Sequence, residues 1–142
     1  MKKAEGIRQV LVGIIAVSMM IFLNGCGGVN DLGIYNTNVA PEQQCTLDIA
    51  PFFTVTSFDG EKVSWGAGSL ASTTRISIPA GKHTLLLKYQ DSAGRGSDMV
   101  FTTDDLVAGK NYRLTQERNF LTNTIKVLVI PVDKDYKPPL FH

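Results

Sequence analysis

Cysteine and histidine are scarce in this chain, which has two of each among its 142 residues: Cys26, Cys45, His83 and His142. A zinc site needs three or four such ligands at suitable spacing, and these residues are too few and too widely separated. Asp104-Asp105 could begin a calcium loop, but the regular spacing of oxygen ligands that such loops use does not follow it. We therefore expect no metal site and no cofactor.

Sequence signatures of a hydrolase are also missing. No serine lies in the G-x-S-x-G pattern of a nucleophile elbow. Ser77, His83 and Asp98 can be combined into a serine-histidine-aspartate triple, but any chain of this length offers such triples. His83 falls next to a turn on the inward face of a predicted strand, where a histidine is more often packed or hydrogen-bonded than catalytic. We expect no catalytic residues.

The chain carries little net charge, with 14 basic and 13 acidic residues and a formal charge of +1. A nucleic-acid-binding domain has a clustered basic face, and this sequence has no run of like charges. We therefore expect no nucleic-acid partner.

A long hydrophobic run is missing as well. The apolar stretch Val10–Leu23 has 14 residues, whereas a helix needs about 20 to cross a bilayer. A stretch of this length after Lys2, Lys3 and Arg8 is typical of a secretion signal, whose apolar region has about 7–15 residues. A short uncleaved anchor or a buried core helix is the alternative interpretation.

The four residues that follow, Leu23-Asn24-Gly25-Cys26, resemble the lipobox of bacterial lipoproteins. The resemblance implies that the Cys26 thiol receives a diacylglyceryl group, that the chain is cut after Gly25 and that the new N-terminus is acylated, for example with palmitate. Gly27 takes the place of the aspartate that retains such proteins at the inner membrane of enteric-type bacteria. The resemblance thus implies a cell-envelope protein that is lipid-anchored through Cys26, at the outer membrane.

Removal of residues 1–25 leaves 117 residues with 11 basic and 12 acidic side chains, enough for one domain and a tether. The start of this mature chain is rich in Gly, Asn and Gln, and 18 such residues would reach roughly 20–25 Å if fully flexible. Its apolar residues, among them Tyr35, indicate that part of it docks on the domain. We expect a signal peptide, a lipidated cysteine with tether, a β-sandwich domain and a tail, at 1–25, 26–44, 45–132 and 133–142.

Cys45 has no partner in the chain once Cys26 carries lipid. The thiol can then be buried, form a mixed disulfide or bridge two molecules. Free cysteine is among the most buried residue types, which favours burial in a strand.

From Cys45 onward the apolar residues repeat with a period of two, which predicts strands. Asp59-Gly60 is a strong hairpin signal, Pro51 belongs at an edge or a bulge, and the apolar run Asn123–Pro131 is typical of a central strand. Seven or eight short strands separated by turns predict a small antiparallel β-sandwich. The predicted strands are 46–50, 52–58, 61–65, 74–78, 82–90, 99–103, 110–116 and 123–131.

Two stretches of the predicted sandwich, Ile78–Leu85 and Ala108–Leu114, are similar to the PEGA and carboxypeptidase-regulatory-like modules of bacterial envelope proteins. The match rests on "Ile-Pro-Ala-Gly-Lys-His-Thr-Leu" before one strand, Phe101, and "Gly-Lys-Asn-Tyr" before another. Asp59-Gly60 also fits the hairpin of that pattern. The resemblance implies a β-sandwich that acts in binding or as a spacer, and it transfers no functional residues.

Adjacent strand residues point to opposite faces, so one of Phe52 and Phe53 should lie outside the core. This pair is the candidate binding surface, together with the loops Gly66–Ser72 and Asp91–Ser97, because loops on a rigid sandwich commonly carry recognition. We expect a non-catalytic binding or structural module that contacts an envelope protein or a glycan. The alternative is a small envelope hydrolase or metal-dependent enzyme.

Overall fold

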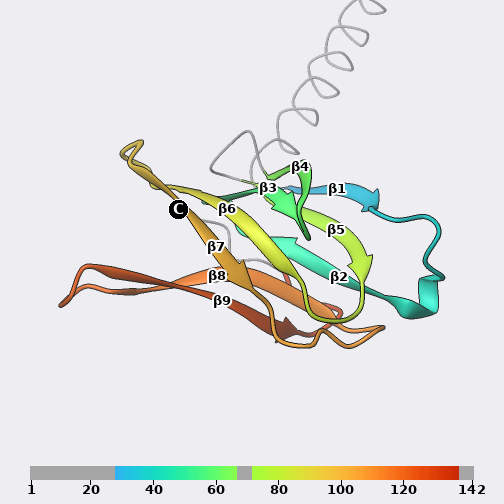
Figure 1. Cartoon of the computed structure of the whole chain (residues 1–142). Coiled ribbons are helices and arrows are strands. Elements are labelled where there is room, and N and C mark those ends of the chain that lie inside the picture. The colour runs from blue at the N-terminus through green and yellow to red at the C-terminus, as the bar shows by residue number, and fades with distance from the viewer. Residues whose placement is uncertain (1–27, 67–71, 138–142) are drawn as a thin grey trace, which may run out of the picture.

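The computed structural model describes residues 28–66 and 72–137 (Figure 1). The predicted signal peptide, Cys26, most of the Gly66–Ser72 loop and the end of the tail lie outside these residues. Within the described ranges the chain forms nine strands and a short 3₁₀ helix, Pro41–Gln43. None of the described segments is a helix with the length and apolar character needed to span a bilayer.

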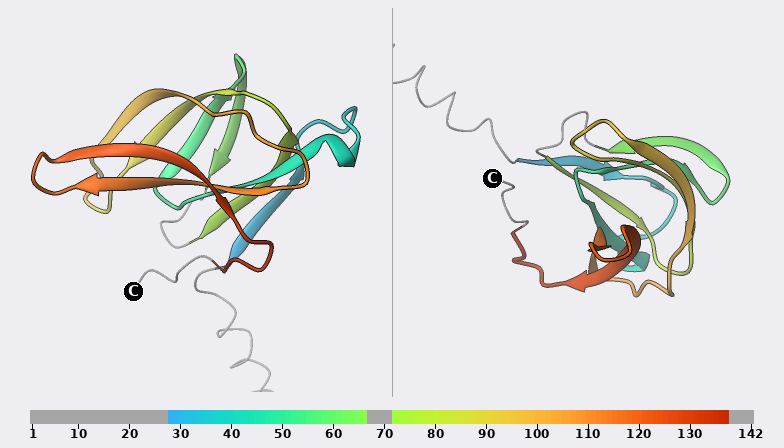
Figure 2. Two further views of the ribbon diagram at one scale, coloured as in Figure 1. Left: turned by 90° about the horizontal axis from the view of Figure 1, so that it is seen from below. Right: turned by 90° about the vertical axis from the view of Figure 1, so that its left-hand side faces the viewer.

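The strands form two sheets that enclose one hydrophobic core, which confirms the predicted β-sandwich (Figure 1). The larger sheet has five strands in the order β1 (Val29–Ile34), β5 (Thr73–Pro79), β2 (Gln44–Ile49), β8 (Asn111–Asn119) and β9 (Thr124–Val132). The smaller sheet has four strands in the order β4 (Glu61–Gly66), β3 (Phe53–Phe58), β6 (Thr84–Gln90) and β7 (Gly96–Thr102). Figure 2 shows that the β8–β9 hairpin extends beyond the rest of the sandwich.

The chain alternates between the sheets, and this route creates two parallel pairs in the larger one. Strands β3 and β4 of the smaller sheet separate β2 from β5, and β6 and β7 separate β5 from β8. β1 pairs with β5 and β2 pairs with β8 in the parallel sense, while the remaining pairs are antiparallel. Parallel neighbours need a long crossover, which the hairpins of the smaller sheet provide.

The core follows the predicted alternation. Cys45, Leu47 and Ile49 of β2 face Leu85 and Leu87 of β6, and all five side chains are buried. Cys45 is a free, buried thiol, as its sequence context predicts. Desolvation raises its pKa to about 11, so almost none of the reactive thiolate exists at neutral pH.

A β-bulge at Thr56 changes the alternation of β3. The pairing of β3 with both neighbours shifts between Val55 and Ser57. The extra residue turns the following part of the strand over, because successive side chains of a regular strand point to opposite faces. Phe53 and Val55 before the bulge and Phe58 after it therefore all point into the core.

The segment expected to be a tether, 26–44, supplies an edge strand. β1 pairs with β5, beginning with Val29 opposite Thr73. Just after β1, the ring of Tyr35 makes edge-to-face contacts with Phe58 at 5.0 Å and with Trp65 at 4.9 Å. Tyr35 thus docks this segment on the domain, whereas Val29, Leu32 and Ile34 of β1 are exposed.

Two strand-level predictions are wrong. The run Asn123–Pro131 forms the edge strand β9 rather than a central strand, and β2 occupies the centre. The apolar character of β9 arises because Val127 and Val129 pack on the core while Ile130, on the other face, is exposed. Pro51 lies buried in the turn between β2 and β3, where the chain changes sheets and no ladder bond is required of it.

The loop Asp91–Ser97 is shorter and more tightly bonded than its composition suggests. Asp91 accepts hydrogen bonds from the backbone N–H groups of Ala93 at 3.0 Å and Arg95 at 2.9 Å, and from the Arg95 side chain at 2.9 Å. Gly96 and Ser97 already belong to β7. The loop is therefore a closed turn held by one carboxylate.

Neighbouring leucines of β6 test the two-layer core. Leu87 is 0 % exposed, whereas Leu86 is 38 % exposed on the other face of the same strand. We expect Leu87→Ala to lower the free energy of unfolding by about 2–5 kcal/mol, and Leu86→Ala by less than about 1 kcal/mol. Urea denaturation of both variants measures the difference. Equal losses would contradict the assignment of faces in β6.

Candidate functional site

A pocket of about 440 Å³ opens at the end of the sandwich where β1 and β5 finish and the β3–β4 turn lies. Its wall combines aromatic rings with carboxylates: the lining residues are Tyr35, Asn36, Phe58, Asp59, Glu61 and Pro79. Three separate parts of the chain therefore meet here. One of them directly follows β1, a strand that the sequence analysis did not predict.

His83 lies buried next to this pocket, just before β6. Its Nδ1 is 2.7 Å from Oδ2 of Asp59, and its Nε2 is 2.7 Å from the carbonyl oxygen of Pro79. Its backbone N–H donates to Oγ1 of Thr103 at 3.0 Å, and its ring packs on Phe58 with centroids 4.6 Å apart. The prediction that His83 is a packed, hydrogen-bonded residue is confirmed.

Asp59 connects the β3–β4 turn to β6. With φ of 47° at Asp59 and 86° at Gly60, the pair forms the predicted hairpin, which needs positive φ at both positions. The Asp59 carboxylate accepts a hydrogen bond from the Thr84 N–H at 2.8 Å through Oδ1, while Oδ2 faces His83. The Asp59 N–H donates to the Thr84 carbonyl at 2.8 Å.

This arrangement makes the Asp59–His83 pair a connector between elements. A general base needs a free nitrogen within reach of the proton that it removes. Both ring nitrogens of His83 already face oxygen acceptors that belong to the fold. Ser77, His83 and Asp98 do not form a catalytic triad either. Ser77 lies opposite Thr46 in the larger sheet, and Asp98 lies opposite Lys88 in the smaller one.

Tyr35 and Glu61 form a second polar pair on the wall of the pocket. The Tyr35 hydroxyl donates a hydrogen bond to Oε2 of Glu61. This bond raises the pKa of Tyr35 above its ordinary value of 10.0, and desolvation and the negative charges of Glu61 and Asp59 add to the effect. The phenol therefore stays protonated and remains a hydrogen-bond donor at physiological pH.

Metal ligands do not gather in the part of the chain that the structure describes. Residues 28–66 and 72–137 contain no group of three or more histidine, cysteine, aspartate or glutamate side chains placed to hold a metal ion. The predicted lipidation site, Cys26, lies outside these residues.

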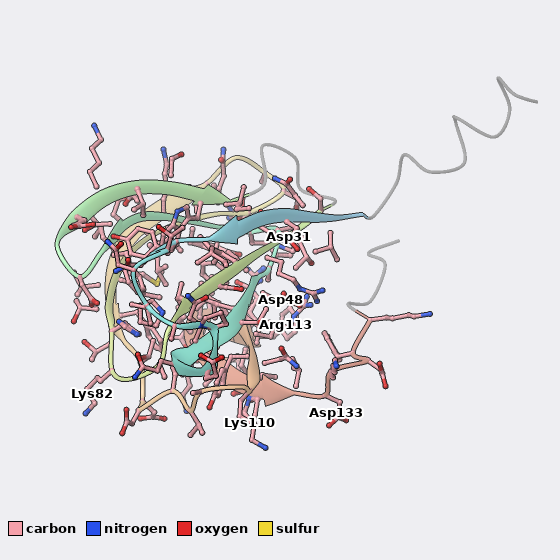
Figure 3. All side chains as sticks on the ribbon, turned by 90° about the vertical axis from the view of Figure 1, so that its right-hand side faces the viewer. Asp31, Asp48, Lys82, Lys110, Arg113 and Asp133 are labelled. Atoms are coloured by element: carbon pink, nitrogen blue, oxygen red, sulfur yellow. The ribbon has the colours of Figure 1, made fainter. Side chains whose placement is uncertain are left out.

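A row of alternating charges crosses the outer face of the larger sheet, and sequence reasoning missed it. Asp31 of β1 lies opposite Arg75 of β5, Arg75 opposite Asp48 of β2, and Asp48 opposite Arg113 of β8. Figure 3 shows Asp31, Asp48 and Arg113 following one another across this face. Only the pairing of four strands brings these charges together. The sequence signal is limited to a charged residue at an outward-facing position of each strand.

The centre of this row is an ion pair whose carboxylate is buried and whose guanidinium reaches solvent. Asp48 is 2 % exposed and accepts two hydrogen bonds from Arg75, from Nε at 2.7 Å and Nη2 at 2.8 Å. These bonds raise the pKa of Arg75. Arg113, also buried, lies with its guanidinium carbon 5.3 Å from the ring centroid of Tyr136. The row thus links four strands of the larger sheet, with Asp48 and Arg113 buried and with Asp31 and Arg75 reaching solvent.

The predicted binding pair is divided between the core and its margin. Phe53 is a fully buried core residue. Phe52 is partly buried, packs against the core and lies with its ring centroid 6.5 Å from that of Tyr89. Any surface that this pair offers to a partner therefore comes from Phe52.

No protein-family model, no curated protein and no solved structure matches this chain. The site must therefore be interpreted from its own geometry.

The Asp59–His83 connector can be tested by a double-mutant cycle. His83→Gln should lower the free energy of unfolding by about 1–3 kcal/mol, because it breaks buried hydrogen bonds. Asp59→Asn keeps a residue that tolerates positive φ and removes the charge. The two changes should show a coupling of about 0.5–3 kcal/mol in urea denaturation, as residues in direct contact do. Additive effects would contradict a direct bond between the side chains.

The Tyr35–Glu61 bond predicts a change in titration. In Glu61→Gln the phenol loses its anionic acceptor, so the pKa of Tyr35 should fall toward 10. Glu117→Gln, which removes a carboxylate in the β8–β9 hairpin, is the matched control and should leave Tyr35 unchanged. The ¹³Cζ shift of Tyr35, followed by NMR as pH rises, measures the pKa in both variants. A pKa that stays the same in Glu61→Gln would contradict the bond.

Proposed function

We propose that this protein is a lipid-anchored lipoprotein of the bacterial cell envelope whose sandwich is a non-catalytic binding or structural module. The apolar stretch Val10–Leu23 and the lipobox-like residues up to Cys26 support the anchor. The Asp59–His83 connector supports the non-catalytic part. Both ring nitrogens of His83 face oxygen atoms of the fold, at Asp59 and Pro79, and are not free to act as a base.

One structural observation carries the proposal: β1 begins at Val29. Only Gly27 and Gly28 separate Cys26 from the first strand. Three residue steps span at most about 10–11 Å when fully extended. A lipid on Cys26 therefore keeps the sandwich at the membrane surface, rather than on the longer tether that composition suggests.

With the proposed anchor at Cys26, the pocket would lie at the end of the larger sheet that faces away from the membrane. The pocket lies where β1 ends, and the six residues of β1 run from the anchor toward it. At about 3.3 Å per residue the strand spans roughly 20 Å. The carboxylates of Asp59 and Glu61 accept hydrogen bonds, so this end suits a partner group that carries N–H or O–H donors, on an envelope protein or a glycan.

The anchor is tested by comparing the two cysteines. Cells that express the wild type, Cys26→Ala or Cys45→Ala are labelled with an alkyne analogue of palmitate. We expect the wild type and Cys45→Ala to incorporate the label and to sediment with membranes. Cys26→Ala should lose the label and retain residues 1–25.

The Cys45→Ala variant serves as the matched control, because it removes the other thiol without touching the lipobox-like residues. Label that persists in Cys26→Ala would sink the lipoprotein proposal. Label that is lost equally in both variants would sink it as well, since the acyl chains would then depend on the fold rather than on Cys26.

A further inference from the structure

The tip of the β8–β9 hairpin exposes two large apolar side chains next to each other. Phe120 is 83 % exposed and Leu121 is 97 % exposed. Adjacent apolar residues at the end of a projecting hairpin cannot contribute to the core. Their contact with water is unfavourable relative to burial in an apolar environment. Figure 2 shows the end of the hairpin extending beyond the other strands of both sheets.

The turn itself does not require these apolar residues. Oδ1 of Asn119 accepts hydrogen bonds from the N–H groups of Leu121 at 3.0 Å and Thr122 at 3.3 Å. Asn123 supplies the positive φ, 50°, that closes the turn. Polar residues thus build the turn, as they commonly do, and Phe120 and Leu121 remain available for an environment outside the molecule.

Cationic side chains flank the apolar tip. Arg118 holds its guanidinium carbon 5.5 Å from the ring centroid of Phe120 and donates a hydrogen bond to Asn123 at 3.2 Å. Lys126 lies on the facing strand, opposite Glu117. Apolar side chains at the tip with long cationic side chains behind them match the boundary between acyl chains and headgroups, where the cations stay at the polar level.

The hairpin projects from the end of the sheet at which β1 begins. One row across the sheet places Asn30, the second residue of β1, opposite Thr74, Thr74 opposite Ile49, and Ile49 opposite Leu114. β8 runs against β1, so its last five residues continue past this row toward the anchor end. In the left view of Figure 2 the hairpin tip lies at the left and β1 begins at the bottom.

We propose that Phe120 and Leu121 insert into the bilayer to which Cys26 is anchored, so that the β8–β9 hairpin is a second membrane contact. The inference rests on the proposed function, because the lipid on Cys26 is what brings the hairpin close to a bilayer. The two contacts together fix the tilt of the sandwich. They direct the Tyr35–Asp59–Glu61 pocket away from the membrane.

The depth of a nitroxide label tests this contact in the full-length lipidated protein. Leu121→Cys carries the label at the tip. Val107→Cys is the matched control, because Val107 is also apolar and exposed, at 56 %, but lies in the loop before β8 at the opposite end of the sheet. Cys45 stays unlabelled in the folded protein, because it is buried and its pKa is raised to about 11.

Both labelled proteins are reconstituted into vesicles of phosphatidylethanolamine and phosphatidylglycerol, and collisions with oxygen and with a water-soluble nickel complex are measured by EPR. We expect the label at residue 121 to lie about 5–10 Å below the headgroup boundary. The label at residue 107 should stay in water.

Equal exposure of both labels to the nickel complex would overturn the inference. A label at residue 121 that is shielded from both reagents would overturn it too, because that pattern indicates a protein surface rather than lipid. Palmitate labelling of the same preparations separates the two proposals. If Cys26 carries lipid and residue 121 remains in water, the hairpin contact fails while the lipoprotein proposal stands.

Discussion

The packing of β2 against the smaller sheet is the contact on which the rest of the structure depends. Leu47 and Ile49 have no exposed surface, and they meet the equally buried Leu85 and Leu87 of β6. The other face of β2 carries Asp48, which is buried as well and is neutralised by Arg75. A buried carboxylate without its partner is strongly destabilising. The register of β5 on β2 supplies this partner, because it places Arg75 opposite Asp48.

That register also determines which parts of the molecule lie at each end of the larger sheet. β5 joins β2 to β1, so the position of Val29 is determined by the same ladder that places Arg75. The proposed anchor and the β8–β9 hairpin lie toward one end, and the pocket lies at the other. Tyr35, which directly follows the edge strand β1, packs against Phe58 and Trp65 at the pocket end. A lipid at one end and a binding surface at the other is an arrangement suited to holding a partner at a defined height above a membrane.

Sequence patterns predicted those parts of the fold that local chemistry decides. The alternation of His83, Leu85, Leu87 and Tyr89 determines one face of β6, and Asp59-Gly60 specifies the β3–β4 turn through positive φ, so both could be predicted.

The missed features depend on pairing between distant segments. β1 lies in a polar segment that becomes a strand only because β5 offers a free edge. The bulge at Thr56 moves Phe58 into the core through a shift that no period reveals. The pocket joins three segments, and the sequence offered only His83 and the hairpin as signs of it.

The direction of β1 has a mechanical consequence. β1 is parallel to β5, and the proposed anchor attaches to its N-terminal end. A pull between the membrane and a partner held at the pocket end would act on opposite ends of this parallel pair. The hydrogen bonds between β1 and β5 would then bear the load together instead of opening one after another. The strand that composition presents as a loose linker would serve as the force-bearing joint of the protein.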